Sequence, residues 1–140
     1  MTIKVKLDPG AYIPARAYDT DAGFDLKTPI DFLVPAGGSA TVDTGVHMLI
    51  PDGYCGLLVS KSGLNTKKSI TSTGLVDSGY NGSIVVKLYN HDKGREQTFH
   101  AGEKISQIAI LPIAAIYGLE VVTDLEDTPR GSNGFGSTGA

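Results

Sequence analysis

A carboxylate in a glycine-rich stretch is the first group in this sequence that could do chemistry. Asp77 lies in Gly74-Leu75-Val76-Asp77-Ser78-Gly79-Tyr80-Asn81-Gly82, where small residues leave the backbone open and Tyr80 follows three positions later. A carboxylate in such surroundings can orient and deprotonate a water molecule. An aspartate in a turn is more often only a turn-former, so this segment by itself leaves both interpretations open.

A second segment, Ser60-Lys61-Ser62-Gly63-Leu64-Asn65, combines hydroxyls, a cation and a glycine, which are suited to bind phosphate. A solvated turn has the same composition. Ser60 and Lys61 could also be taken for a nucleophile pair, but neighbours in sequence need not have the geometry that such a pair requires. Gln107, in Gly102-Glu103-Lys104-Ile105-Ser106-Gln107-Ile108, could donate to phosphate or simply lie exposed on a strand.

Metal binding has one carboxylate candidate outside the Asp77 segment. Asp25 is flanked by apolar residues in Ala22-Gly23-Phe24-Asp25-Leu26, so it either faces a polar site or is buried and accepts backbone hydrogen bonds. The histidines at positions 47, 91 and 100 lack the spacing of zinc ligands. Magnesium held mainly by substrate phosphates, with one distant carboxylate, is compatible with the sequence.

The C-terminal residues 130–140 contain one guanidinium group, one aromatic ring and many glycines. They fit the dinucleotide pattern G-x-G-x-x-G from Gly134 to Gly139, but no strand precedes them at the spacing that this motif requires. Phe135 could stack on a base, and Arg130 could bind phosphate oxygens. The segment therefore has the parts of a lid over a nucleotide, although a disordered Gly/Ser tail has the same composition.

The elements that position these groups are predicted to be strands, because apolar residues recur with period two. The predicted strands cover residues 3–7, 41–50, 84–89 and 104–111, and residues 113–122 form a further apolar stretch that Gly118 breaks. Turn-forming sequences separate them, and Asn81-Gly82 predicts a hairpin. No stretch of ten or more residues has sustained helical periodicity. Short strands with frequent turns favour a sandwich or a barrel over residues 1–123, followed by an arm over residues 124–140.

Composition excludes several classes of function. The 140 residues fit one domain, and the net charge of −3 argues against non-specific nucleic-acid binding. No apolar run approaches the ~18 residues of a membrane span. One cysteine gives no internal disulfide, and the N-terminus has no signal-peptide core, so we expect a cytoplasmic protein without a membrane or nucleic-acid partner.

Together the five segments resemble, in order and approximate spacing, the five motifs of the trimeric dUTPase family, over about residues 22–139. One departure concerns the second motif, which usually has the sequence Pro-Arg-Ser-Gly in the family. This chain has Ser60-Lys61-Ser62-Gly63, which keeps the positive charge but loses the planar, bidentate guanidinium. We predict that phosphate binding survives this change.

The resemblance implies an all-β, jelly-roll-like distorted barrel with a flexible C-terminal arm, assembled as a homotrimer. Its active sites would lie at subunit boundaries, with motifs one, two and four from one chain, motif three from a second and motif five from a third. The implied reaction is Mg²⁺-assisted hydrolysis of dUTP to dUMP and pyrophosphate. This activity in nucleotide metabolism limits the incorporation of uracil into DNA.

The resemblance also implies roles for single residues. Asp77 would activate the water that attacks the α-phosphorus, and Tyr80 would pack under the deoxyribose and leave no room for a 2′-hydroxyl. The backbone of the same hairpin would bind the uracil edge, and Asp25 would help to hold Mg²⁺ through water. The remaining substrate-binding residues would be Lys61, Ser62, Gly63, Gly74, Val76, Gln107, Arg130, Phe135, Gly136, Ser137 and Thr138.

Two alternatives stay open. The related dCTP deaminase group shares the fold, but we expect it to have a different acid in the base pocket and no tail of this composition. A binding or regulatory protein on the same scaffold, such as a phage-type signalling dUTPase, is the other alternative. No long insertion between the motifs suggests a surface for such a partner.

Overall fold

The structure, a computed structural model, describes residues 1–136 and 139. This part of the chain forms, in order, β1 (Lys4–Leu7), β2 (Gly23–Lys27), β3 (Phe32–Val34), β4 (Ser39–Asp43), β5 (Val46–Leu49), β6 (Tyr54–Val59), α1 (Ser62–Lys68), β7 (Ile70–Val76), β8 (Val85–Asn90), β9 (Gln97–Phe99) and β10 (Lys104–Pro112). The predicted all-β class is therefore confirmed.

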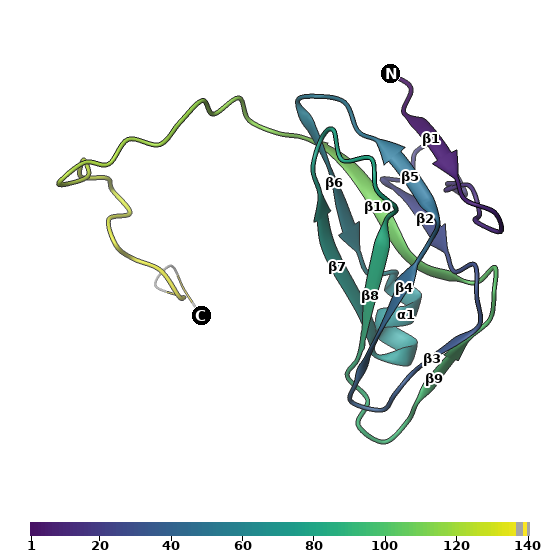
Figure 1. Ribbon diagram of the computed structural model, residues 1–140. Helices are drawn as coiled ribbons and strands as arrows, with labels where there is room; N and C mark the ends of the chain where they lie inside the picture. The colour runs from purple at the N-terminus through teal and green to yellow at the C-terminus, as the bar shows by residue number, and fades with distance from the viewer. Residues whose placement is uncertain (137–138, 140) are drawn as a thin grey trace.

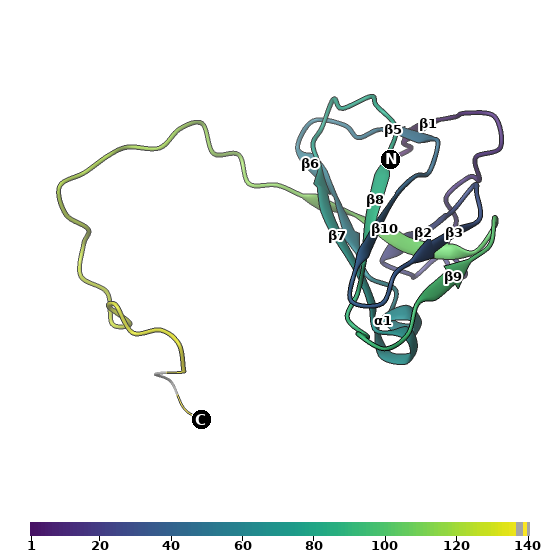
Figure 2. The same ribbon diagram turned by 60° about the horizontal axis from the view of Figure 1, so that its bottom comes forward.

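The main element is a six-stranded sheet with the strand order β2-β10-β6-β7-β8-β4, and all of its pairings are antiparallel. The pairs β1-β5 and β3-β9 form two smaller sheets. The large sheet curls, and the two small sheets lie on its concave side, as Figures 1 and 2 show. This curvature lets the inward-facing side chains of different strands meet in one core.

Strand β8 shows the alternation on which the strand predictions rest. Val86 and Leu88 are fully buried, whereas the neighbouring Val85, Lys87 and Tyr89 are exposed. Inward-facing residues of the other strands complete the core, whose largest fully buried side chains are Phe99, Leu26, Ile50, Ile70, Ile84, Leu88, Ile105 and Ile108. Burial of these apolar side chains is the main favourable contribution to folding.

The strand predicted over residues 41–50 is wrong as a single element, because it divides into β4 and β5. Thr44 and Gly45 break it, and Gly45 has a φ of 67°, a conformation that a residue with a side chain rarely adopts. The hydroxyl of Thr44 donates to the Ile84 carbonyl at 2.7 Å and so ties this break to the end of the β7–β8 loop.

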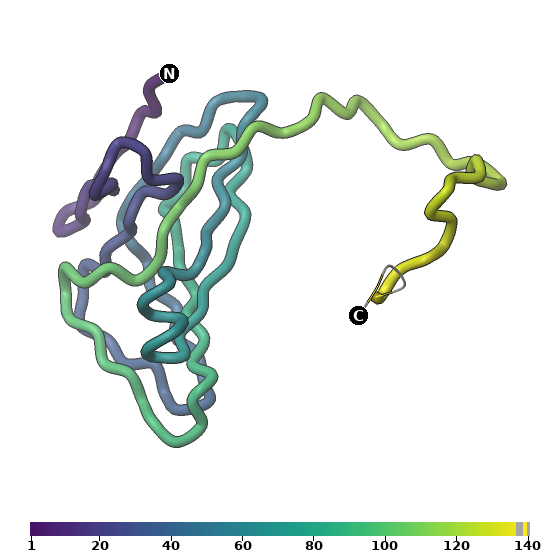
Figure 3. Tube along the Cα trace, turned by 180° about the vertical axis from the view of Figure 1, so that it is seen from behind, coloured from purple at the N-terminus to yellow at the C-terminus, as the bar shows by residue number. Residues whose placement is uncertain are grey.

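The apolar stretch over residues 113–122 forms no strand and lies outside the sheets. Leu119 is 95% exposed and Val121 is 98% exposed. Figures 1 and 3 show the chain leaving the barrel after β10, where no other segment lies beside it. A strand needs a partner for its backbone hydrogen bonds, and here the chain offers none. The domain boundary at residue 124 stays a prediction.

A short helix, α1, occupies the segment for which the sequence suggested a turn. Its seven residues make about two turns, which is too short for a detectable helical periodicity. Lys67 and Lys68 lie in its last turn, where cations interact favourably with the helix dipole, and Ser69 ends it in a left-handed conformation. Among the described residues, no helix has the length and hydropathy of a membrane span.

Candidate functional site

A carboxylate held between two lysines is the centre of the first cluster. Asp25 lies on β2, and its side chain is only 10% exposed. One of its oxygens accepts a hydrogen bond from Lys61, which directly precedes α1. Its other oxygen lies 2.7 Å from Nζ of Lys104, at the start of β10. The structure thus brings together three predicted motifs, those of Asp25, Lys61 and Lys104.

The ion pairs determine the protonation of this cluster. Burial raises the pKa of Asp25, but the hydrogen bonds and positive charges of Lys104 and Lys61 outweigh burial, so that the pKa lies below its ordinary value. In turn, the hydrogen bond and charge of Asp25 raise the pKa of Lys104. The cluster therefore carries one negative and two positive charges at neutral pH, and its net positive charge suits a phosphate chain.

Gln107 lies beside this cluster because β10 runs between β2 and β6. It is opposite Asp25 on one side and Val59 on the other, and its side-chain amide donates to the Ser60 carbonyl at 3.1 Å. A Cβ at Gly23 would come within 2.8 Å of the Gln107 side-chain oxygen. Gly23 therefore provides the space that Gln107 occupies, a role that the sequence analysis missed, as it missed Lys104.

The start of α1 presents backbone N–H groups beside Lys61. The helix begins at Ser62, and no side chain caps its first turn. A Cβ at Gly63 would meet no atom within 4 Å, so the space in front of it is open. The first N–H groups of a helix lack partners within the helix and can bind an anion. Ser62 and Gly63 therefore lie at an open helix start, and their binding of phosphate stays a prediction.

The second cluster surrounds a cavity of about 460 Å³ at the β7–β8 loop. Asp77 and Tyr80 line it, together with Thr41, Leu58, Thr73, Gly74, Leu75, Val76, Ser83, Ile84, Val85 and Lys87. The Tyr80 hydroxyl donates to the Ser83 carbonyl at 3.0 Å, which folds the ring over the loop. A Cβ at Gly82 would overlap that ring, so only glycine allows this position of Tyr80.

The cavity lies where β7 and β8 separate. The pairing of β7 with β8 ends at Ser72, opposite Leu88, whereas the pairing of β7 with β6 continues as far as Val76. In the described part of the chain, the edge of β7 that faces β8 therefore has no strand partner over residues 73–76. Its backbone N–H and C=O groups are available to a ligand, as a base edge with donors and acceptors would need.

Asp77 and the lysine cluster lie toward opposite ends of β6, although Leu58 and Thr73, which also line the cavity, lie near the Lys61 end. Gly56 is opposite Val76, next to the cavity, whereas Lys61 follows the far end of the strand. The steps from Gly56 to Lys61 correspond to roughly 16 Å along an extended chain. The pairing of β6 with β7 thus separates Asp77 from Lys61 along the sheet of one chain.

The C-terminal candidates contact neither cluster. Nε of Arg130 donates to the Asn133 carbonyl at 3.0 Å, a local contact, and Phe135 is fully exposed with a φ of 50°. Gly136 has a φ of 87°. Figure 3 shows this end of the chain far from the barrel. Ser137 and Thr138 lie outside the described residues.

The residues can be tested for a resident metal site. Across residues 1–136 and 139, no group of three or more His, Cys, Asp or Glu side chains could hold a metal ion. Both oxygens of Asp25 already bind ammonium groups. A metal bound directly to Asp25 would share these oxygens with two lysines, whereas a contact through an intervening water would leave both ion pairs in place.

A sequence profile of the family described as dUTPase matches residues 10–139. The chain belongs to the dUTPase family. It is 40% identical, over 144 residues, to the deoxyuridine 5′-triphosphate nucleotidohydrolase of Tropheryma whipplei (strain Twist), with 99% of this chain and 96% of the relative covered. It is 38% identical, over 142 residues, to the enzyme of the same name from Mycobacterium tuberculosis (strain H37Rv), with 96% and 92% covered.

Solved dUTPase structures share the fold. The dUTPase of Staphylococcus bacteriophage 80alpha with dUpNHpp superposes with a TM-score of 0.87 at 30% identity, over 99% of both chains. A mutant dUTPase from phage phi11 of S. aureus, described with a structural Mg(II) ion, has a TM-score of 0.82 at 28% identity. The predictions of a jelly-roll fold and of a dUTP diphosphatase are therefore confirmed.

Proposed function

We propose that Asp77 activates the water that hydrolyses dUTP at the α-phosphorus. The water oxygen forms the new bond to phosphorus, its proton passes to the Asp77 carboxylate, and the bond to the oxygen that bridges the α- and β-phosphates breaks. Pyrophosphate leaves and dUMP remains. The observation that carries the proposal is the cavity at the β7–β8 loop, which exposes Asp77 beside Tyr80.

The shape of this cavity favours a 2′-deoxyuridine. The Tyr80 ring, held over Gly82 by its hydrogen bond to Ser83, would pack against the sugar and exclude a 2′-hydroxyl. The open β7 edge at Gly74 and Val76 would pair with the donors and acceptors of uracil. A base that lacks matching groups would leave buried backbone atoms unpaired, which is costly, and this cost provides selectivity.

The phosphates would bind the lysine cluster of a neighbouring copy. Lys61, the first N–H groups of α1 at Ser62 and Gly63, and the Gln107 amide form a positively charged surface with several donors. Two observations support an assembly with shared sites. The clusters are separated in one chain, and the arm exposes apolar residues such as Leu119 and Val121 that another subunit could cover.

We infer a homotrimer in which Arg130 and the segment from Phe135 to Thr138 close over the nucleotide from a third chain. Arg130 would bind the terminal phosphate, and Phe135 would stack on uracil. Arg130 and Phe135 contact neither cluster in the single chain, and ordering the segment costs about 1–2 kcal/mol of backbone entropy per residue. Substrate contacts must therefore supply the energy for closure.

Magnesium is best described as part of the substrate. Bound to the triphosphate, Mg²⁺ would neutralise part of its charge. Asp25 would contact it through water, which leaves both of its ion pairs with lysines in place. The main contribution of Asp25 is to hold Lys61 and Lys104 side by side, where they face the phosphate chain.

The test is pyrophosphate release from dUTP, with dTTP, dCTP and UTP as controls. We expect the protein to hydrolyse dUTP and none of the three control nucleotides. Asp77→Asn should lower kcat by at least about 10³-fold while the variant still binds a non-hydrolysable dUTP analogue. Full activity of this variant would refute Asp77 as the base. Ammonia release from dCTP would instead favour the deaminase alternative.

A further inference from the structure

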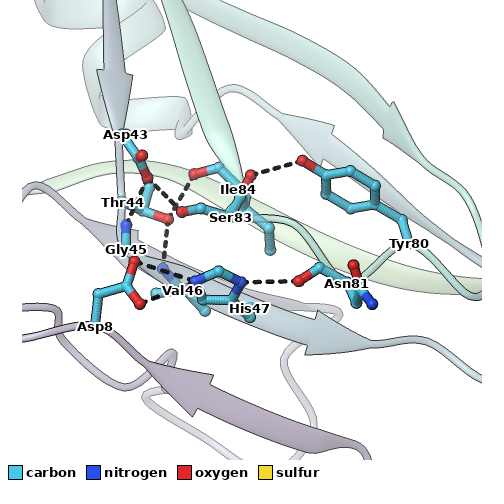
Figure 4. A network of polar contacts seen from close by, with 10 residues as sticks. All are labelled: Asp8, Asp43, Thr44, Gly45, Val46, His47, Tyr80, Asn81, Ser83 and Ile84. Carbon is cyan, nitrogen blue, oxygen red and sulfur yellow. Dashed lines mark hydrogen bonds and ion pairs between the residues drawn. The ribbon is translucent and has the colours of Figure 1, made fainter.

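His47 lies between two hydrogen-bond acceptors. It is on β5, with its side chain 20% exposed. Its Nδ1 is 2.8 Å from the carbonyl oxygen of Asn81, and its Nε2 is 3.0 and 3.1 Å from the two carboxylate oxygens of Asp8. Figure 4 shows the ring between the two partners, which come from different segments of the chain.

This geometry requires a doubly protonated ring. A carbonyl oxygen and an ionised carboxylate can only accept hydrogen bonds, and a neutral imidazole has one N–H and one lone pair. Either neutral tautomer would turn its lone pair toward one of the two acceptors. Only the imidazolium donates to Asn81 and to Asp8 at the same time.

We call the contacts of His47 with Asn81 and Asp8 the clamp. Other contacts hold both of these partners in place. On one side the Asp8 amide donates to the Gly45 carbonyl at 2.9 Å, and a Cβ at Gly45 would come within 2.9 Å of the Ala11 side chain. Glycine at this position lets the Asp8 turn approach β5. On the other side, Asn81 lies in the loop that carries Asp77 and Tyr80, and it directly follows Tyr80.

Further contacts attach this loop to the rest of the fold, at Gly79, Ser83 and Ile84. The Gly79 amide donates to the Ile50 carbonyl at 3.2 Å, and the Ile84 amide donates to the Val46 carbonyl at 2.8 Å. Ser83 donates to the Asp43 carboxylate, as Figure 4 also shows. Among the described contacts, the bond from His47 to Asn81 is the side-chain support nearest to the backbone of Tyr80.

We propose that the imidazolium of His47 positions the 77–84 loop, and through it Tyr80, by bridging the Asn81 carbonyl and the Asp8 carboxylate. His47 is a positioning residue, and this role rests on the proposed function of the cavity. Because its contact is to the loop and not to the reacting atoms, its loss should affect substrate fit more than the chemical step.

The charged groups around His47 influence the pH at which its ring loses the second proton. Asp8 favours the charged ring, whereas Lys6, which lies opposite His47 on β1, opposes it. The pKa of nearby Asp43 is lowered mainly by its hydrogen bonds from Ser83 and the Gly45 amide, with a smaller contribution from the His47 charge. The hydrogen bond to the Asn81 carbonyl and the contact with Asp8 raise the pKa of His47 above its ordinary 6.5. The clamp is therefore complete below that value and is lost as the pH rises through the raised pKa.

The experiment measures KM and kcat for dUTP, and the dUTP to UTP preference, at several pH values around the His47 titration. Three variants are compared with the parent: His47→Asn, Asp8→Asn and the control His100→Asn. His100 is a suitable control because it also lies near an aspartate, Asp31 at 3.7 Å, but on an exposed turn. In the parent, Asp8→Asn and His100→Asn proteins, NMR of the imidazole ring gives the pKa of His47.

We expect His47→Asn to raise KM roughly tenfold at low pH, with little change in kcat, and to abolish the pH step seen in the parent. Asp8→Asn should move that step, and the pKa of His47, to lower pH. His100→Asn should behave as the parent. A His47 that titrates at or below its ordinary value, or a His47→Asn variant with the parental KM at every pH, would overturn the proposal.

The design separates failure of the clamp from failure of the proposed function. A parent protein that hydrolyses no dUTP would refute the function, while the His47 titration and its dependence on Asp8 still decide whether the clamp exists. If His47→Asn fails to fold, Asp8→Asn keeps the imidazole in place and gives the same decision from the shift of the pH step.

Discussion

Nζ of Lys104 lies 2.7 Å from one carboxylate oxygen of Asp25, and Lys61 binds the other oxygen. One nearly buried carboxylate thus fixes two cations that come from distant parts of the chain. With this arrangement we expect a lysine to serve at the position where the family's second motif usually has an arginine. Asp25 orients the single ammonium group, as the planar fork of an arginine would otherwise do for itself.

Removing the Asp25 carboxylate should therefore affect both stability and phosphate binding. For Asp25→Asn we expect a loss of about 1–2 kcal/mol in the free energy of unfolding at pH 7, because two lysines lose their counter-ion, and both are partly solvated. Urea unfolding measures this loss. Asp52→Asn, in an exposed turn, is the matched control and should change stability by less than about 0.5 kcal/mol.

The same ion pairs predict an acid-dependent loss of stability. The folded pKa of Asp25 lies below its unfolded value of 3.8, so its contribution is present above pH 3.8 and is lost as the pH falls through the folded pKa. The difference in unfolding free energy between the parent and Asp25→Asn should shrink across that range. A difference that stays constant from pH 7 to pH 3 would contradict the ion-pair account.

Substitutions of Lys61 can distinguish the contribution of its positive charge to phosphate binding from the contribution of its side-chain shape. Lys61→Ala should raise KM for dUTP by about tenfold or more, since it removes a cation from the phosphate surface. Lys61→Arg should stay within about threefold of the parent, because Asp25 can hold either cation. Steady-state kinetics decide this, and equal KM values for all three proteins would show that Lys61 does not bind phosphate.

Gly82 should control the discrimination between deoxyribose and ribose. Gly82→Ala places a methyl group where the Tyr80 ring lies, so the ring must move. We expect the ratio of kcat/KM for dUTP over UTP to fall by about tenfold or more. In Gly94→Ala the nearest neighbour of the added Cβ is 3.6 Å away, an ordinary contact, so this variant is the control. An unchanged ratio in Gly82→Ala would remove Tyr80 from sugar selection.

The C-terminal segment should be needed for turnover but not for assembly. Deletion of residues 130–140 removes Arg130 and Phe135, which contact neither the core nor the sheets. We expect kcat/KM to fall by about 10²-fold or more, while light scattering still gives the mass of a trimer. Dissociation into monomers would show that the segment holds the assembly together instead.

Much of the fold follows from local patterns in the sequence. The alternation in β8 and β10 is visible in the residues themselves, because a strand turns successive side chains to opposite faces. The motif that contains Asp77, Gly79 and Gly82 likewise predicts a loop that joins two strands, which the structure confirms. Local patterns failed at Thr44-Gly45, where a left-handed glycine divides one apolar run into two strands.

Only the tertiary structure decided which distant residues meet. The antiparallel register of β2, β10 and β6 brings Asp25, Gln107 and Ser60 together, and the ion pairs with Lys61 and Lys104 follow from it. His47 and Asp8 meet across 39 positions of the chain, and no spacing rule predicts such a pair. Sequence determined which groups are available for chemistry, since their types and order are local properties. Which of these groups share a site depends on strand register and chain reversal, which are decided by packing over the whole fold.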